Sequence, residues 1–182
     1  MADRILTRQV LELEQTQLAL FYPILQKGVA VLVDVGCPLK SLLCDQFAIP
    51  ETYVTDRITT VFLDNQPVDD LDHAIICNGS RIALSAAMPG LVGATMRRGG
   101  FYAALRHGIS QLAQDSPMTH GKGTVTLKLF NLLLAEVGPL VLARGILLER
   151  SVLDKLLQNL PVVPDSMPDC GDRVLLSVTL TN

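Results

Sequence analysis

The segment with the clearest capacity for chemistry is Arg97-Arg98-Gly99-Gly100, which precedes an apolar-periodic stretch beginning at Phe101. A helix beginning there would present backbone N–H groups without intrahelical partners, and glycine would let a ligand approach them closely. Arginine adds a charged bidentate donor, and Arg106 and His107 could add further charge. The sequence therefore predicts a small-anion site, for phosphate or carboxylate, at Arg97, Arg98, Gly99, Gly100 and Arg106. The alternative interpretation is a turn with solvated arginines.

A second glycine-rich segment, His120-Gly121-Lys122-Gly123-Thr124, has a superficial likeness to a phosphate-binding loop. Such a loop requires Gly-x-x-x-x-Gly-Lys-Ser/Thr after a strand and before a helix, whereas here a strand pattern follows. We therefore expect a loop that leads into a strand.

Cys37 is the best candidate for a reactive thiol, because it precedes a predicted helix start where the dipole would lower its pKa. No histidine lies near it in sequence. Cys44 and Cys77 have the character of small apolar core residues. A buried structural thiol is the alternative for Cys37 as well.

An acidic cluster, Asp69, Asp70, Asp72 and His73, offers oxygen ligands close together for a divalent cation. Its spacing fits no calcium loop, so a solvated turn between strands is the expected structure and no metal site is predicted. With three histidines and no Gly-x-Ser-x-Gly motif, the sequence assembles no nucleophilic triad and points to no cofactor.

Composition narrows the class of protein. The chain has 182 residues, of which 49% are hydrophobic, enough for a sizeable core, and no uncharged apolar stretch reaches the length of a membrane span. A net charge of −3 and an aromatic content of 4% argue against nucleic acid as a partner. The N-terminus is unlike a signal peptide and the four cysteines are widely spaced, so we expect a cytoplasmic protein without contact to a membrane.

Hydrophobic periodicity predicts a mixed α+β fold. Residues 4–21 carry apolar side chains at helical spacing, although residues 18–25 could instead form a hairpin strand with the next segment. Strands are predicted at residues 29–35, 58–63, 82–88, 124–129 and 174–180, and helices at 38–49, 101–112 and 151–160. In the strand at 82–88, Ile82, Leu84, Ala86 and Met88 are expected on the core face.

Glycines at positions 90, 93, 99 and 100 mark the boundary expected between two parts of the chain. Residues 1–93 would form a helix and a strand-rich part, and residues 94–182 an α/β extension packed on it, possibly as one domain. The segment lacks the polar composition of a free linker.

Residues 29–90 resemble the β-grasp, ubiquitin-like fold, especially the sulfur carriers of the ThiS and MoaD type. The residues that carry the resemblance are Val29–Val35, the helix after Gly36, the turn "FLDNQPV" and the segment "CNGSRIALSAAMPG". In the carriers a terminal diglycine becomes the thiocarboxylate, whereas here Pro89-Gly90 and Gly99-Gly100 are internal. The resemblance implies the fold, and a carrier activity only if the chain were cleaved after a glycine pair.

The absence of a recognisable reactive constellation favours a non-enzymatic binding or assembly module, acting on a protein partner or as a homo-oligomer. A protein or enzyme that recognises a small anion at Arg97–Gly100 is the alternative from another class. A carrier released by cleavage is the third.

Overall fold

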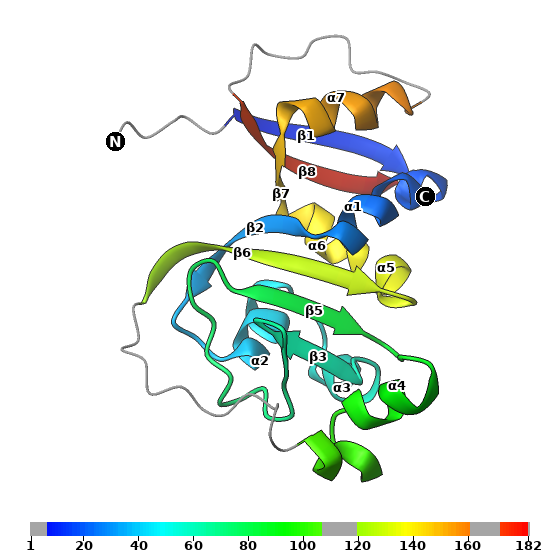
Figure 1. Cartoon of the computed structure of the whole chain (residues 1–182). Coiled ribbons are helices and arrows are strands. Elements are labelled where there is room, and N and C mark those ends of the chain that lie inside the picture. The colour runs from blue at the N-terminus through cyan, green and yellow to red at the C-terminus, as the bar shows by residue number, and fades with distance from the viewer. Residues whose placement is uncertain (1–6, 107–119, 161–171, 182) are drawn as a thin grey trace.

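A computed structural model describes residues 7–106, 120–160 and 172–181. Their strands form one mixed sheet of eight, in the order β1-β8-β7-β2-β6-β5-β3-β4, with helices packed mainly on one face (Figure 1). The α+β class predicted from the sequence is confirmed. The strands are β1 (Thr7–Glu14), β2 (Val29–Val35), β3 (Thr60–Leu63), β4 (Gln66–Pro67), β5 (Arg81–Ser85), β6 (Gly121–Phe130), β7 (Ile146–Glu149) and β8 (Arg173–Thr181).

The helical elements are short, and several are not α-helical. η1 and η3 are 3₁₀ helices and η2 is a π-helix. No helix of the described part is long and apolar enough to cross a membrane. The elements are η1 (Gln15–Phe21), α1 (Tyr22–Lys27), α2 (Leu39–Ser41), η2 (Leu42–Gln46), α3 (Glu51–Asp56), α4 (Gly90–Met96), η3 (Phe101–Arg106), α5 (Leu133–Glu136), α6 (Gly138–Arg144) and α7 (Arg150–Gln158).

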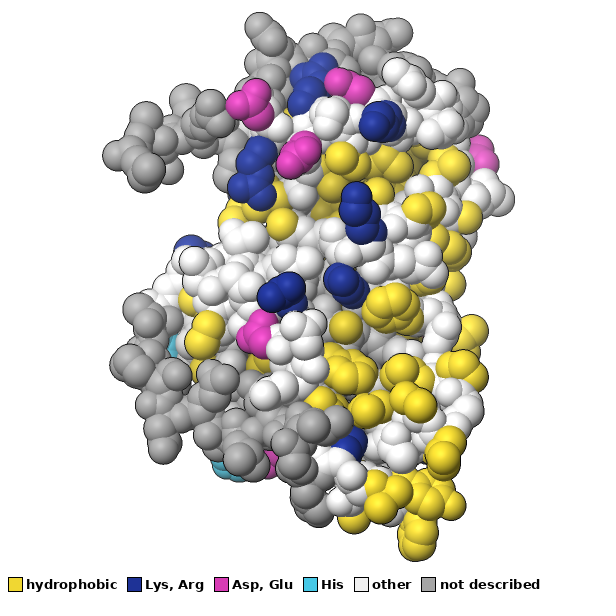
Figure 2. Space-filling model, in the orientation of Figure 1, with side chains coloured by type: hydrophobic (Ala, Val, Ile, Leu, Met, Phe, Trp, Pro, Cys, Tyr) yellow, Lys and Arg dark blue, Asp and Glu magenta, His cyan; other side chains and the backbone are white. Residues whose placement is uncertain are grey.

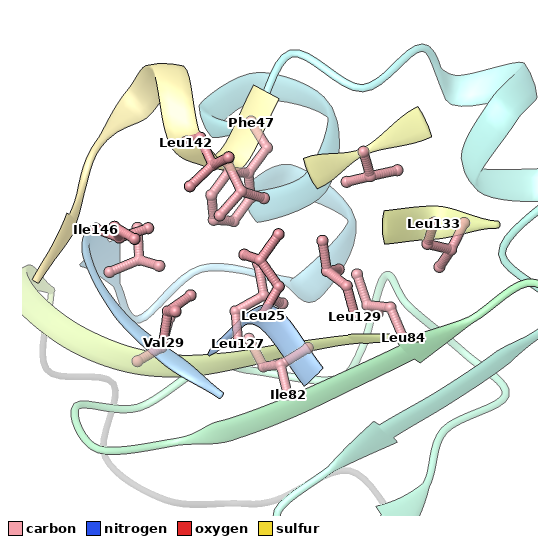
Figure 3. Packing of buried hydrophobic residues seen from close by; sticks show 14 of the residues in the cluster. Leu25, Val29, Phe47, Ile82, Leu84, Leu127, Leu129, Leu133, Leu142 and Ile146 are labelled. Atoms are coloured by element: carbon pink, nitrogen blue, oxygen red, sulfur yellow. The ribbon is translucent and has the colours of Figure 1, made fainter. Parts of the chain in front are cut away.

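The core lies between the sheet and the covering helices. Val29, Leu127 and Leu84, from three adjacent strands, are buried there, and Leu25 of α1 and Leu142 of α6 approach them from the helical side (Figure 3). On the opposite face of the same strands, Leu32 is exposed and Thr126 is half-buried. The period of two in these strands therefore separates a helix-covered face from a more open one.

The helix predicted at residues 4–21 is wrong for residues 7–14, whereas residues 15–21 are helical as η1. Residues 7–14 form β1, which pairs in parallel with β8. The spacing of the apolar residues in this segment fits a helix as well as a strand. In the structure burial alternates as in a strand: Gln9, Leu11 and Leu13 are buried, and the residues between them are exposed. Pairing with a strand more than 160 residues away decided between them, because backbone hydrogen bonds to β8 are available only in the folded chain.

Residues 18–25, left open between helix and strand, are helical. η1 runs into α1, and Pro23 lies in the first turn of α1, where its missing N–H costs no hydrogen bond. The predicted strands at residues 29–35 and 124–129 are confirmed as β2 and β6. The elements α3, α4, α5, α6, β4 and β7 were not predicted; each has seven residues or fewer.

The core face of β5 was predicted correctly within the strand and wrongly beyond it. Ile82 and Leu84 are buried, but the strand ends at Ser85, which is itself buried. Ala86 is half-buried and Met88 is 36% exposed. The alternation continues in the sequence after the hydrogen-bonded ladder has ended, so it misled the prediction at this end.

The boundary expected near residue 93 falls between β5 and β6, which are parallel neighbours in the sheet. β6 also pairs with β2, so strands from both expected parts alternate across one sheet. Residues 1–93 and 94–182 therefore share a single core.

Candidate functional site

A cleft of about 680 Å³ lies where the chain leaves β5 and passes through α4 into η3. Small side chains and backbone form most of its wall. Thr59 connects the segment after β5 to the segment after α4. Its hydroxyl donates to the carbonyl of Ala86 (2.7 Å), and its carbonyl accepts from the N–H of Arg98 (2.7 Å). The lining residues are Thr59, Ala86, Ala87, Met88, Gly90, Gly93, Ala94, Arg97, Arg98, Gly99, Gly100, Phe101 and Tyr102.

Gly93 sets how closely α4 approaches the loop before it. A Cβ atom at this position would lie 1.9 Å from the carbonyl oxygen of Met88, so any side chain would force the backbone apart. Gly93, which was expected only to mark a boundary between two parts of the chain, is therefore required for close packing of the cleft wall.

The segment Arg97–Gly100, predicted to bind an anion, lines this cleft, but some of its groups make hydrogen bonds within the protein while others are exposed. The N–H of Gly100 donates to the carbonyl of Arg97 (3.2 Å), and the N–H of Gly99 lies 3.4 Å from a carboxylate oxygen of Asp69. Arg97 is exposed. The backbone donors that the sequence suggested for an anion thus have partners within the protein.

Arg98 closes the C-terminal end of α3. One of its guanidinium nitrogens donates to the carbonyls of Val54 (2.7 Å) and Ile58 (3.2 Å), with Thr55 at 3.4 Å. The last carbonyls of a helix have no intrahelical partners, so a cation there satisfies them. Burial lowers the pKa of the Arg98 guanidinium, an effect that the nearby Asp69 opposes.

Replacing Arg98 by alanine is expected to destabilise the protein by about 1–3 kcal/mol, because these carbonyls lose a charged donor. Arg97→Ala is the matched control: it removes the same charge from the adjacent, exposed position and should change stability by less than about 0.5 kcal/mol. Urea denaturation of the two variants makes the comparison. Equal stability of both would show that Arg98 has no structural role.

Arg106 lies apart from the cleft, in a buried ion pair with Asp69. Its side chain is 2% exposed and its two terminal nitrogens donate to the two oxygens of Asp69, at 2.9 and 2.6 Å. Its Nε donates to the carbonyl of Thr95 at the end of α4 (2.7 Å). The residue expected to add charge to an anion site thus joins η3, α4 and the loop at Asp69.

Large apolar side chains are exposed beside the cleft, on α4 and η3. Figure 2 shows hydrophobic side chains gathered over this corner of the molecule. Phe101 is 91% exposed and contacts the edge of Tyr102, with 5.2 Å between the ring centroids. We call this surface the apolar ledge; it comprises Leu91, Val92, Phe101, Tyr102 and Leu105.

The ledge was not predicted from the sequence. The apolar spacing of Phe101, Leu105, Ile109 and Leu112 predicts an amphipathic helix, whereas η3 is a 3₁₀ helix whose only buried residue is Arg106; Ile109 and Leu112 lie outside the described residues. Periodicity alone cannot say whether an apolar stripe faces the core.

A second apolar hollow, of about 200 Å³, continues from the cleft onto the open face of the sheet. Met88 lines both. Phe62, Ala83 and Phe130 form its floor, from three adjacent strands. Cleft and hollow therefore adjoin at Met88, and the ledge lies beside the cleft.

The aspartates of residues 69–73 each lie beside a basic side chain or an imidazole. Asp69 pairs with Arg106, Asp70 with His73 (2.7 Å), and Asp72 lies 3.5 Å from Lys40. Among the described residues no group of three or more His, Cys, Asp or Glu side chains is arranged to hold a metal ion. The solvated turn expected from the sequence fits this arrangement.

The prediction for the Cys37 pKa is wrong. Burial raises the pKa of this thiol, with Asp34 and Asp45 adding to the effect against hydrogen bonds from Gln46 and the backbone. The raised pKa shows that burial outweighs any effect of the dipole of the helical segment that begins at Leu39. The effect of desolvation on the pKa is larger than that of the hydrogen bonds, so the Cys37 thiol is less reactive than a free cysteine.

One cluster of titratable groups was not anticipated: Tyr53 and Arg57, at the C-terminal half of α3, contact Glu136 of α5. The Tyr53 hydroxyl and an Arg57 nitrogen each donate to one oxygen of Glu136, the latter at 2.9 Å. Burial and the neighbouring carboxylate raise the pKa of Tyr53 to about 12. Hydrogen bonds from Tyr53 and Arg57 lower the pKa of Glu136. The cluster joins two helices and lies outside the cleft.

We expect the absorbance of Tyr53 to titrate near pH 12, read from the difference between wild type and Tyr53→Phe at 295 nm. Because the folded-state pKa exceeds the value of about 10 in the unfolded chain, the stability from this group is complete below pH 10 and is lost between about pH 10 and 12. Glu136→Gln should shift the midpoint downward. A difference curve centred near pH 10 would contradict the hydrogen bond between Tyr53 and Glu136.

No family model matches the chain, and neither a curated protein nor a solved structure is similar to it at a significant level.

Proposed function

We propose that this protein is a non-enzymatic binding module that uses the apolar ledge and its cleft to hold an apolar segment of a protein partner. The observation that carries the proposal is the exposure of Leu91, Phe101 and Leu105, at 71%, 91% and 75%, beside a cleft of ligand size. Exposed apolar side chains in one contiguous patch are typical of protein-binding surfaces. An aromatic anchor at the rim is typical of the residues that contribute most to binding.

The state of the charged groups supports binding over catalysis. Arg98 and Arg106, the two strongest candidates for chemistry near the cleft, make contacts within the protein. The thiol of Cys37 has a raised pKa. The cleft wall, formed mostly by glycine, alanine and backbone, offers a bound partner a complementary shape and apolar contacts.

Photo-crosslinking in the native cytoplasm tests the proposal. A benzoyl-phenylalanine in place of Phe101 should capture a defined partner, whereas the same group in place of Lys155, an exposed residue of α7, should not. A second substitution, Leu105→Asp, should abolish capture at position 101 without lowering the melting temperature, because Leu105 is exposed. Equal labelling from both positions, or capture that survives Leu105→Asp, would reject the ledge as a binding surface.

A small anion remains the second candidate, through Arg97, whose side chain is exposed at the cleft. Millimolar phosphate or sulfate should then raise the melting temperature of wild type, and Arg97→Ala should remove that rise. No anion-dependent stabilisation would leave the protein-binding proposal alone.

The β-grasp resemblance and the cytoplasmic location are retained as parts of the proposal. β2, the α2–η2 helical segment, β3 and β5 follow one another in the order that the resemblance implies. A carrier would additionally require release after Gly90 or Gly100, and intact mass from the native source distinguishes such a product from a binding module that keeps α4 and η3.

A further inference from the structure

The two edges of the sheet are constructed differently. β4, at one edge, has only two residues, one of them Pro67, which has no N–H to donate. β1, at the other edge, has eight residues, without proline, glycine or lysine. Natural sheets protect their edges with short strands, proline or charged side chains, especially lysine. β4 is short and contains proline, whereas β1 is long and its exposed charges, Arg8, Glu12 and Glu14, are of both signs.

β1 also has only one strand neighbour. Its ladder with β8 uses one side of the strand, and no other described strand pairs with it. In a strand paired on one side, alternate N–H and C=O groups point away from the partner. An eight-residue template for a further strand therefore lies at this end of the sheet.

The side chains of β1 are self-complementary. On the open face of the strand, Arg8, Val10 and Glu12 are exposed, with Val10 at 63%. If a second β1 runs antiparallel and the two-fold axis passes beside Val10, position i faces position 20 − i. Arg8 then lies opposite Glu12 of the other copy, Glu12 opposite its Arg8, and the two Val10 side chains face each other.

The buried face of β1 favours the same register. Gln9 is 8% exposed, and its Oε1 has no hydrogen-bond partner among the residues that the structure describes. In the register centred on Val10, the two Gln9 residues are diagonal neighbours across the axis, a separation that long side chains span. Each amide could then donate to the unpaired oxygen of the other.

We propose that β1 is a homodimer interface, in which two copies of this chain join their sheets through antiparallel β1 strands centred on Val10. The interface lies at the opposite edge of the sheet from β3 and β4, and it is independent of the apolar ledge. Figure 2 shows both signs of charge close together where β1 and β8 lie, in contrast to the apolar corner at α4.

Cysteine crosslinking tests the geometry. In the proposed register the two residues at position 10 are directly opposite, within the Cα separation of 4.4–6.8 Å that a disulfide requires. Val10→Cys should form a covalent dimer on mild oxidation. Glu12→Cys is the matched control, because two copies of position 12 would be roughly 13 Å apart. Wild type reports the background from the native cysteines. No covalent dimer from Val10→Cys, or equal yields from both variants, would overturn the proposal.

Charge reversal tests the pairing, with sedimentation as the readout. Arg8→Glu and Glu12→Arg place two like-charge pairs in each homodimer, so each variant alone should dimerise about ten-fold more weakly than wild type or worse. An equimolar mixture of the two should restore dimerisation, since every pair is again of opposite sign. The double variant R8E/E12R should also dimerise, whereas R8E/E14R should not. Rescue by R8E/E14R alone, or a wild type that is monomeric at about 100 μM, would overturn the proposal.

Crosslinking from position 101 in the monomeric variants reports separately on the apolar ledge.

Discussion

Asp69→Ala is expected to destabilise the protein by about 3 kcal/mol, the largest effect of any single charged residue near the cleft. The substitution leaves the Arg106 guanidinium, 2% exposed, without the carboxylate that binds both of its terminal nitrogens. Removing one partner of a buried pair typically costs 3–5 kcal/mol, because the remaining charge stays desolvated. Asp69 itself is 43% exposed, so the lower end of that range applies.

Asp70→Ala is the matched control. It removes a carboxylate from the next residue, but Asp70 pairs with an exposed histidine, and such surface pairs contribute about 0–1 kcal/mol. Urea denaturation at two salt concentrations measures both variants. The Asp69 effect should persist at 1 M NaCl, since buried pairs are little screened. Equal losses for the two variants would show that the Arg106 pair is not a structural anchor.

Leu127→Ala should cost about 2–5 kcal/mol, because the side chain is 1% exposed at the centre of the core. Leu127 of β6 lies opposite Val29 of β2 on one side and Ile82 of β5 on the other (Figure 3). A cavity at this position weakens the packing of strands from both halves of the chain at once. For a domain of this size, a loss of about 3 kcal/mol lowers the melting temperature by roughly 6–12 °C.

Leu132→Ala, which truncates an exposed leucine just after β6, should change stability by less than about 0.5 kcal/mol. Calorimetry of Leu127→Ala provides a further readout. A single transition at lower temperature is expected from one shared core. Two separate transitions would show that residues 1–93 and 94–182 fold independently.

The sequence by itself determined the strands in which apolar residues recur clearly at every second position and whose neighbours in the sheet are similarly apolar. In β2, β6 and β8 every second residue is a valine or leucine over most of the strand, and a strand buries such a set on one face of a sheet. It also determined the α+β class and singled out the segment that lines the cleft. These features depend on local pattern, which every chain carries in its primary structure.

Tertiary structure decided the rest. Residues 7–14 are apolar at both helical and strand spacing, and only β8, far away in the sequence, makes the strand the better choice. The arginines before η3 have the types and spacing of an anion site, but the carbonyls of α3 and the carboxylate of Asp69 lie within reach of Arg98 and Arg106 in the folded chain. Phe101 and Leu105 have a core-like pattern, and nothing local indicates that η3 turns them outward. The partner of a charge or of an apolar face is a long-range property, and its energy depends on contacts that only the assembled core provides.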